Sequence, residues 1–230
     1  MIYLKEFNTT EEYNAFVESG QMKRPNVSLV NEPFTTYYNK YFPLGVFIQH
    51  VDGTLFTEAD WTSSGFSNEE ANGVAVITDN ARFVVAKVIP GKASYYDTDI
   101  TTPIDGISSS GSKDFAGQKN TNILLSTGKS EAAAMAANYS FPNGNKGYLP
   151  ALGELLEIKT FYSQFLSAMN SIGGVVINSS GPNPILSSTQ GDTTYHMVMT
   201  YSFFQGSVNP YGADYYKTEQ FSILPFTSLD

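Results

Sequence analysis

Two pairs of carboxylates are the residues of this chain whose type and spacing best suit acid–base chemistry. Glu154 and Glu157 are three positions apart in a stretch with helical periodicity, so both can lie on one side of a helix. Asp97 and Asp99 flank Thr98 in a polar stretch. Glycoside hydrolysis uses two facing carboxylates about 5–10 Å apart. For Glu154, near the positive end of a helix dipole, we expect hydrogen bonds that tie neighbouring loops.

Two short motifs resemble ion-binding loops without their key residues. The Ser-Thr-Gly-Lys-Ser run at 126–130 ends like a phosphate-binding loop, but Ile123 stands where that motif needs glycine. We predict a helix start there, capped by Ser126 or Thr127. The Asp-Thr-Asp run at 97–99 lacks the glycine and glutamate of an EF-hand loop. No cofactor is expected, with a looser loop calcium ion as the open alternative.

The two histidines, His50 and His196, have no partner at the spacing that metal or catalytic sites need. Neither has a His or Glu at metal-ligand spacing on a helix. The chain has no Gly-x-Ser-x-Gly elbow for a nucleophilic serine. It has no cysteine, which excludes disulfides, cysteine-based zinc sites and thiol nucleophiles. We expect both histidines to be polar strand members or surface residues, and the protein not to be an enzyme.

The best functional signal is an aromatic and amide-rich stretch, residues 195–216. Tyr, Ser, Asn and Gly dominate it, as in paratopes, where tyrosine supplies rigid contact area and small polar residues supply adaptable hydrogen bonds. The alternation of Met197, Met199 and Tyr201 predicts a strand, whereas residues 209–216 predict an exposed loop. The alternative is a strand pair whose aromatics fill the core. The candidate ligand-binding residues are Tyr201, Phe204, Gln205, Asn209, Tyr211, Asp214, Tyr215 and Tyr216.

Strands and a long loop precede this stretch. Apolar runs on both sides of the Asp-Gly turn at 52–53 predict a hairpin. Two runs rich in β-branched residues, 73–77 and 82–86, predict a buried antiparallel pair. Residues 97–128 are rich in Gly, Ser, Thr and Asp, which predicts mostly loop.

Helical periodicity occurs in the middle of the chain. Residues 130–138 are rich in alanine, which suits close packing against another element. A second helix is predicted over 150–158, with Pro150 at its first position because its φ is preset and its missing N–H is not needed there. A third is predicted over 161–169, and glycines end it at 173–174.

Composition limits the partners. The 230-residue chain has a net charge of -9 and a pI of about 4.6, so nucleic acid and anionic membrane surfaces are excluded as partners. Hydrophobic residues make up 41%, which is enough for a packed core. The sequence shows no run of 18 apolar residues and no signal peptide. We therefore expect no membrane insertion, and the family resemblance described below implies synthesis in a bacterial cytoplasm.

Residues 1–44 are predicted to form an N-terminal arm of helix and strand before a head at 45–230. Thr9 and Glu12 have capping-box spacing, and the helix that follows has one apolar stripe. A helix this short needs a partner surface. We interpret the segment as a docking arm; the alternative is an ordinary first helix and strand of the domain.

Several landmarks of the head occur in an order that resembles a known family. They include residues 114–121, Gly-Tyr-Leu-Pro at 147–150, Ser-Ser-Thr at 187–189 and the closing run 221–226. The head resembles C-type-lectin-like domains of phage and Bacteroidales surface proteins, distantly similar to formylglycine-generating enzymes and to variable proteins diversified by retroelements. The arm, with Leu-Lys-x-Phe-x-Thr and Arg-Pro-Asn-Val-Ser-Leu, resembles Bacteroidales phage structural proteins. Ile-Leu replaces the family's Tyr-Trp before 187, so Trp61 or C-terminal aromatics would fill that core.

The resemblance implies an α+β, C-type-lectin-like fold with two or three helices and small twisted antiparallel sheets. It implies a virion structural or display protein of the receptor-binding or fibre type, assembled as a homo-oligomer with a trimer favoured. The head would bind a host surface protein or glycan, and residues 1–44 would contact other virion proteins. Formylglycine chemistry needs cysteines, which are absent. The alternatives are a decoration or assembly protein with 209–216 buried between subunits, and a carboxylate-dependent hydrolase.

Overall fold

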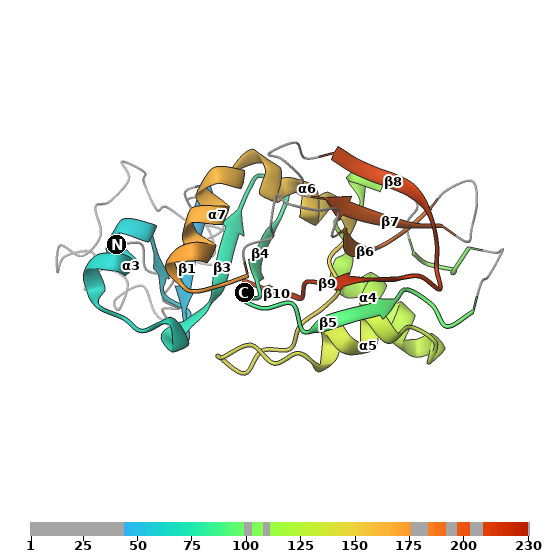
Figure 1. Ribbon diagram of the computed structural model, residues 1–230, viewed down its shortest axis with the longest axis horizontal. Helices are drawn as coiled ribbons and strands as arrows, with labels where there is room; N and C mark the ends of the chain where they lie inside the picture. Colours follow the sequence, from blue (N-terminus) through green and yellow to red (C-terminus); the bar gives the residue numbers. More distant parts are fainter. Residues whose placement is uncertain are drawn as a thin grey trace, which may run out of the picture.

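Two five-stranded sheets and the helices packed on them make up a mixed α+β domain. This computed structural model describes residues 44–98, 103–107, 111–175, 184–191, 197–202 and 209–229. The expected arm, His196, Phe204 and Gln205 lie outside this part of the chain. Figure 1 shows the two sheets side by side along the long axis of the domain. The expected α+β class is confirmed, but the described residues form five α-helices rather than two or three.

The first sheet has the strand order β10-β4-β3-β1-β2, with every neighbouring pair antiparallel. Both expected features are confirmed, because β1 and β2 form the hairpin and β3 and β4 form the buried pair. All seven residues of β3 are buried, so this central strand is covered on both faces. The strands are β1 (Gly45–His50), β2 (Leu55–Phe56), β3 (Ala71–Ile77), β4 (Arg82–Val85) and β10 (Phe226–Ser228).

Alternation along β3 sends its side chains into two separate cores. Val74 and Val76 join the cluster that contains Phe165 and Met169 of helix α7 (Tyr162–Ser171). Ala75 belongs to a second cluster, on the other face. Trp61 and Phe226 belong to the same cluster as Ile185.

The second sheet has the order β5-β9-β6-β7-β8. The pair β6–β9 is parallel and the other pairs are antiparallel, so the expectation of purely antiparallel sheets was wrong here. Buried alanines of helix α5 (Glu131–Asn138) pack with Leu186, Phe221 and Ile223, as their small size allows. The strands are β5 (Gly91–Ser94), β6 (Ile185–Gln190), β7 (Met197–Ser202), β8 (Asn209–Tyr216) and β9 (Gln220–Ile223).

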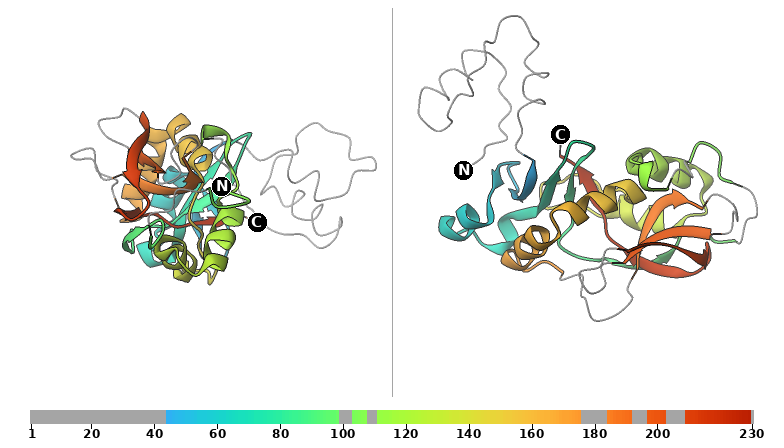
Figure 2. Two further views of the ribbon diagram at one scale, coloured as in Figure 1. Left: turned by 90° about the vertical axis from the view of Figure 1, so that its right-hand side faces the viewer. Right: turned by 90° about the horizontal axis from the view of Figure 1, so that it is seen from above.

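The chain passes directly from the second sheet to the first between β9 and β10. Only Leu224 and Pro225 separate these two strands. Phe226 then pairs with Val85 of β4 and exchanges two backbone hydrogen bonds with Tyr148, at 2.7 and 3.0 Å. In both Figure 1 and Figure 2, helix α3 (Glu58–Ser64) and the β7–β8 hairpin lie at opposite ends of the domain.

Two helices were not expected from the sequence, α3 and α4 (Gly117–Thr127). Helix α4 lies within the stretch predicted as loop. Its sequence is polar, but the helix is stabilised by tertiary contacts, since Leu124, Asn120 and Thr121 are buried against the rest of the fold. In the part of the chain that the structure describes, no helix has the length and apolarity to cross a membrane.

Two predicted helix starts were also wrong. Thr127 ends α4 at the left-handed Gly128, and Ser130 caps the next helix, α5 (Glu131–Asn138), by accepting from the amide of Ala133 at 3.1 Å. Helix α6 (Leu152–Thr160) begins two residues after Pro150. Pro150 precedes the N-cap, and its carbonyl accepts from the Ser188 amide of β6 at 2.7 Å.

Replacing Phe83 with alanine should destabilise the domain by about 3–5 kcal/mol. Phe83 is fully buried and stacks on Phe226 at a ring separation of 4.5 Å, so the change opens a cavity between β4 and β10. Urea unfolding gives the free energy. The matched control is Leu125→Ala on α4, where a 38% exposed side chain should cost less than about 1 kcal/mol. Equal losses would contradict this packing.

Candidate functional site

Six of the eight candidate ligand-binding residues lie on the β7–β8 hairpin, at the outer edge of the second sheet. The register aligns Tyr201 with Pro210 and Thr200 with Tyr211, with an irregularity between Val198 and Thr200. Such bulges are common at sheet edges and next to binding sites. These six residues are Tyr201 on β7 and Asn209, Tyr211, Asp214, Tyr215 and Tyr216 on β8.

The expectation of an exposed loop at 209–216 was wrong, since Asn209–Tyr216 is strand β8. Asn209, Pro210 and Gly212 suggested a turn, but strand formation depends on the neighbouring strand more than on composition. Pro210 lacks an N–H and is therefore tolerated on an edge strand such as β8. The expected strand around Met197 and Tyr201 is confirmed as β7.

Strand β6 positions this hairpin, because β7 pairs with β6 on one side and with β8 on the other. All six residues of β6 are buried, including the polar run Ser187, Ser188, Thr189 and Gln190. Buried hydroxyl and amide groups destabilise a fold unless they form hydrogen bonds. The partners of these side chains therefore determine how firmly β6 is held.

Asp114 is the centre of the hydrogen-bond network beneath β6. Its carboxylate is 3% exposed and accepts from Thr189 Oγ1 at 2.8 Å, from Asn120 Nδ2 at 2.9 Å and from the Ala116 amide at 3.0 Å. Thr189 Oγ1 in turn accepts from the Leu152 amide at 2.9 Å. One hydroxyl thus joins the buried carboxylate to the first turn of α6.

Ser188 is fixed through its backbone as well as its side chain. Its amide donates to the Pro150 carbonyl at 2.7 Å, and its carbonyl accepts from the Tyr95 hydroxyl at 2.9 Å. Burial, with a smaller contribution from the charge of Asp114, raises the pKa of Tyr95, so this hydroxyl keeps its proton and stays a donor. The expected structural role of the Ser-Ser-Thr run is consistent with these bonds.

Gln190 attaches a separate segment, residues 103–107, to the end of β6. Its Nε2 donates to the carbonyls of Ile104 at 3.1 Å and Ile107 at 2.8 Å, and its Oε1 accepts from the Ile104 amide at 2.9 Å. Gln190 is aligned with Val198 of β7. This segment is therefore held beside the strand that carries the hairpin.

Glu154 ties the turn before α6 to the helix, as expected. It accepts from the Ala151 amide at 2.7 Å and from the Tyr148 hydroxyl at 3.0 Å. Burial raises the pKa of Glu154 to about 7 and outweighs these hydrogen bonds, which lower it. Glu157 has a different partner, Asn80 in the β3–β4 turn, so these two carboxylates do not share a site.

Sequence reasoning missed Asp114, Asn120, Tyr95 and Gln190 as the network that holds β6. Gly117, next to Ala116 of this network, leaves no room for a side chain, which would collide with the Glu154 carboxylate and the Ala151 amide. Of the second carboxylate pair, Asp97 is described and Asp99 is not. Within the described ranges, no group of three or more His, Asp or Glu residues could hold a metal ion.

Comparison of the chain with protein-family models, with curated proteins and with solved structures found no match. The fold and the site are therefore interpreted from their own geometry.

Replacing Thr189 with valine should lower the free energy of unfolding by about 2–4 kcal/mol. The change keeps the shape but leaves the Leu152 amide and one Asp114 contact without a partner in a dry interior. Chemical denaturation measures the loss. Thr62→Val is the control, since Thr62 is exposed on α3 and bonds only the Glu58 carbonyl of its own helix. A loss no larger than in the control would refute the role of Thr189.

Stability should fall as pH rises through the pKa of Glu154. Between its ordinary value of 4.5 and about 7, the folded protein keeps this proton while the unfolded chain has released it. The unfolding free energy should therefore drop by roughly 2–3 kcal/mol between pH 5 and pH 8. Glu154→Gln imitates the protonated acid and should remove most of that drop, whereas Glu157→Gln should retain it. Urea unfolding at both pH values makes the comparison.

Proposed function

We propose that this chain is a non-enzymatic virion display protein with a C-type-lectin-like head that binds a host surface protein or glycan through the β7–β8 hairpin. The single observation that carries the proposal is the placement of six Tyr, Asn and Asp residues on one edge hairpin that pairs with a fully buried strand. A rigid base under polar aromatic residues limits the entropy that binding costs.

The C-type-lectin-like assignment is supported by the way its sequence landmarks meet in space. Tyr148 pairs with Phe226, and the Pro150 carbonyl accepts from the Ser188 amide. Asp114 accepts from Thr189. Segments that are far apart in the sequence thus form one connected centre, to which the runs 114–121, 147–150, 187–189 and 221–226 each contribute a residue.

The arrangement of carboxylates supports binding rather than hydrolysis. Glu154 is used in the turn before α6, and Glu157 bonds an exposed amide of the β3–β4 turn. Asp114 accepts three hydrogen bonds in the interior. A hydrolase would need two carboxylates facing one substrate. All three carboxylates are already used in hydrogen bonds of the fold.

The position of the ends supports attachment at one end and binding at the other. The chain enters the described domain at β1 and its last strand is β10, and both strands belong to the first sheet. The β7–β8 hairpin forms one edge of the second sheet, at the opposite end of the domain from α3 (Figure 2). In the proposed assembly, a homotrimer on the virion, residues 1–44 dock on other virion proteins and the hairpin faces outward.

A second function is favoured by one observation: β8 is eight residues long and is an edge strand of its sheet. An edge strand offers backbone groups that another chain can pair with. The same hairpin would then make contacts between subunits of a decoration or assembly protein. If the hairpin binds a ligand, replacing its tyrosines should weaken ligand binding. If it makes subunit contacts, the same replacement should change the oligomeric state.

Replacing Tyr211, Tyr215 and Tyr216 together with alanine should reduce binding of the full-length chain at least tenfold, because aromatic anchors carry most of the energy of such surfaces. The probes are a glycan array and a panel of intact bacterial cells, read by fluorescence. Tyr162→Ala on α7 is the control and should bind like the wild type.

The oligomeric state of both variants, measured by light scattering, separates the two functions. Loss of binding with an unchanged oligomer supports the display protein. Loss of the oligomer supports subunit contacts, and unchanged binding to a probe that the wild type binds rules out the hairpin as the site.

A further inference from the structure

The two faces of the first sheet differ in how many described side chains lie on them. On the face that carries Val74 and Val76, helices α6 and α7 supply large side chains to the same cluster, among them Leu155 and Phe165. A sheet is stable when the apolar sides of other elements cover it in this way. The described residues therefore account for the burial of this face.

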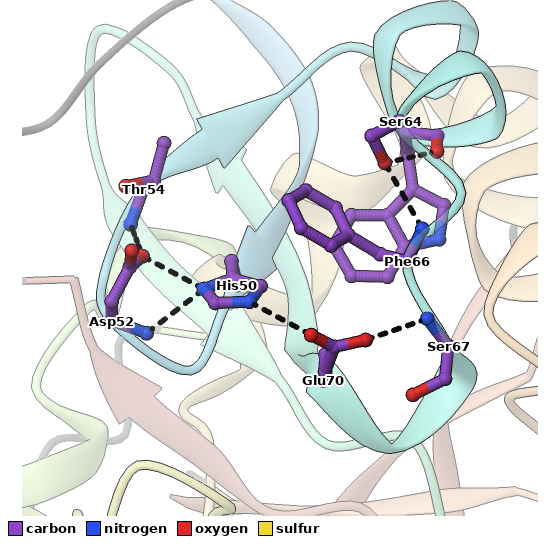
Figure 3. A network of polar contacts seen from close by, with 8 residues as sticks. His50, Asp52, Thr54, Ser64, Phe66, Ser67 and Glu70 are labelled. Carbon is purple, nitrogen blue, oxygen red and sulfur yellow. Dashed lines mark hydrogen bonds and ion pairs between the residues drawn. The ribbon is translucent and has the colours of Figure 1, made fainter.

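The same face is also closed at the end of β1. Figure 3 shows the His50 ring against Phe66, at a ring separation of 4.8 Å, with carboxylate oxygens of Asp52 and Glu70 at 2.9 and 3.8 Å from its two nitrogens. Phe66 packs in turn on Trp61 of α3, at a ring separation of 5.2 Å. Here too, each ring has partners among the described residues.

The opposite face is just as deeply buried, but few described side chains lie on it. Within the described part of the chain, its cluster is completed by Leu229 after β10 and by Tyr139 and Phe141 of the loop before α6. No described helix contributes a residue to this cluster. Its six other side chains, which belong to the strands or directly follow β4, are each at most 6% exposed; they are Phe47, Leu55, Ala75, Ile77, Val84 and Ala86.

Ile77 shows this difference most clearly. It is 1% exposed, although its partners in register are Gly45, which has no side chain, and Arg82, which is only half-buried. The loop before α6 is anchored at the other end of β3, by a hydrogen bond of 3.0 Å from its backbone to Asn72 Oδ1. A fully buried core side chain touches about 6–12 other residues, so this end of the face needs a further apolar cover.

We propose that the predicted helix over 10–19 of the same chain packs its apolar stripe on this face. The stripe consists of Tyr13, Phe16 and Val17, which are three or four positions apart and therefore lie on one side of a helix. A helix this short is marginal in water by itself. The stripe needs an apolar partner and the face needs a cover, so each supplies what the other lacks.

The place where the chain enters the domain favours this occupant. Residues 1–43 precede the described part, which starts at Leu44, and Phe47 of the face follows three positions later. An extended chain spans about 3.3–3.6 Å per residue, so residues 20–43 are long enough to let the helix fold back on the sheet. A segment of the same chain also has a high effective concentration at the face, which favours it over a second copy.

Charge favours the same position. Residues 10–19 contain three glutamates and no lysine or arginine. Arg82 lies on this face because it alternates with Val84, and Lys146 is exposed at the rim, where its carbonyl accepts from Thr227 Oγ1 of β10 at 3.0 Å. Opposite charges around an apolar contact help to fix its orientation.

This inference goes beyond the proposed function and does not rest on it. A helix that packs on the sheet keeps its polar side outward, so that side and residues 20–43 stay available for contacts with other virion proteins. Binding at the hairpin of the second sheet is the same in either case.

Cross-linking of the full-length chain tests this packing, because a chain without cysteine makes two introduced thiols unique. Thr10→Cys lies beside the stripe, three positions before Tyr13, and Lys146→Cys lies at the rim of the face. A short bismaleimide should link this pair within one chain at least fivefold more than the control pair, Thr10→Cys with Lys119→Cys on the exposed side of α4. A denaturing gel separates linked monomers from linked dimers.

Each result of the cross-linking decides the question. A linked monomer at the expected excess supports the proposal. A linked dimer would show that the helix of a second copy covers the face. A yield no higher than that of the control pair would show that the helix does not lie there. Both of these results overturn the proposal.

Hydrogen exchange, measured by NMR on full-length variants, tests the cover independently. Phe16→Asp places a charge in the stripe and should speed exchange of the amides at the Ile77 end of β3 and β4 at least tenfold, because the face opens more often. Ala15→Asp is the control, since it adds the same acid on the other side of the helix and should leave these rates unchanged. Equal rates in the two variants would contradict the proposal. The cross-link leaves the stripe intact and decides the question even where Phe16→Asp does not fold.

Discussion

The structure depends on a buried carboxylate that must be fully hydrogen-bonded. Asp114 sits under the second sheet with three donors around it, and a charge in a dry interior is tolerated only with such partners. Those donors come from β6, from α4 and from the loop before α4. Because one acceptor satisfies all of them together, the helix, the strand and the turn before α6 are fixed relative to one another. The hairpin on β7 and β8 takes its position from this arrangement.

Much of the first sheet could be predicted because its signals are local. An Asp-Gly turn between apolar runs and two runs of β-branched residues each specify a strand pair within a few positions. Glu154 was predicted as a tie between loops from its place near the start of a helix, and in the structure it accepts from the Ala151 amide three residues before it.

The remainder depends on contacts between distant residues, which composition does not reveal. Helix α4 is polar in sequence and is stabilised by what Asn120 and Thr121 touch, the Asp114 carboxylate and the Leu149 backbone. Strand β8 reads as a turn because Pro210 and Gly212 disfavour central strands, and it forms because β7 is already in place beside it. Five of the candidate residues, Asn209, Tyr211, Asp214, Tyr215 and Tyr216, were thus predicted on a loop and lie on a strand.

The passage from β9 to β10 has a consequence for how the chain folds. Gly91 pairs with Ile223 and Val85 with Phe226, so each sheet receives an edge or inner strand from a segment on the order of 100 residues away. Such closures are entropically slow, and here both occur within a few residues of each other. Neither sheet is complete until the segment 220–228 pairs, because it supplies β9 to the second sheet and β10 to the first. Kinetically the two layers should therefore mature in a single, late step rather than as separate lobes.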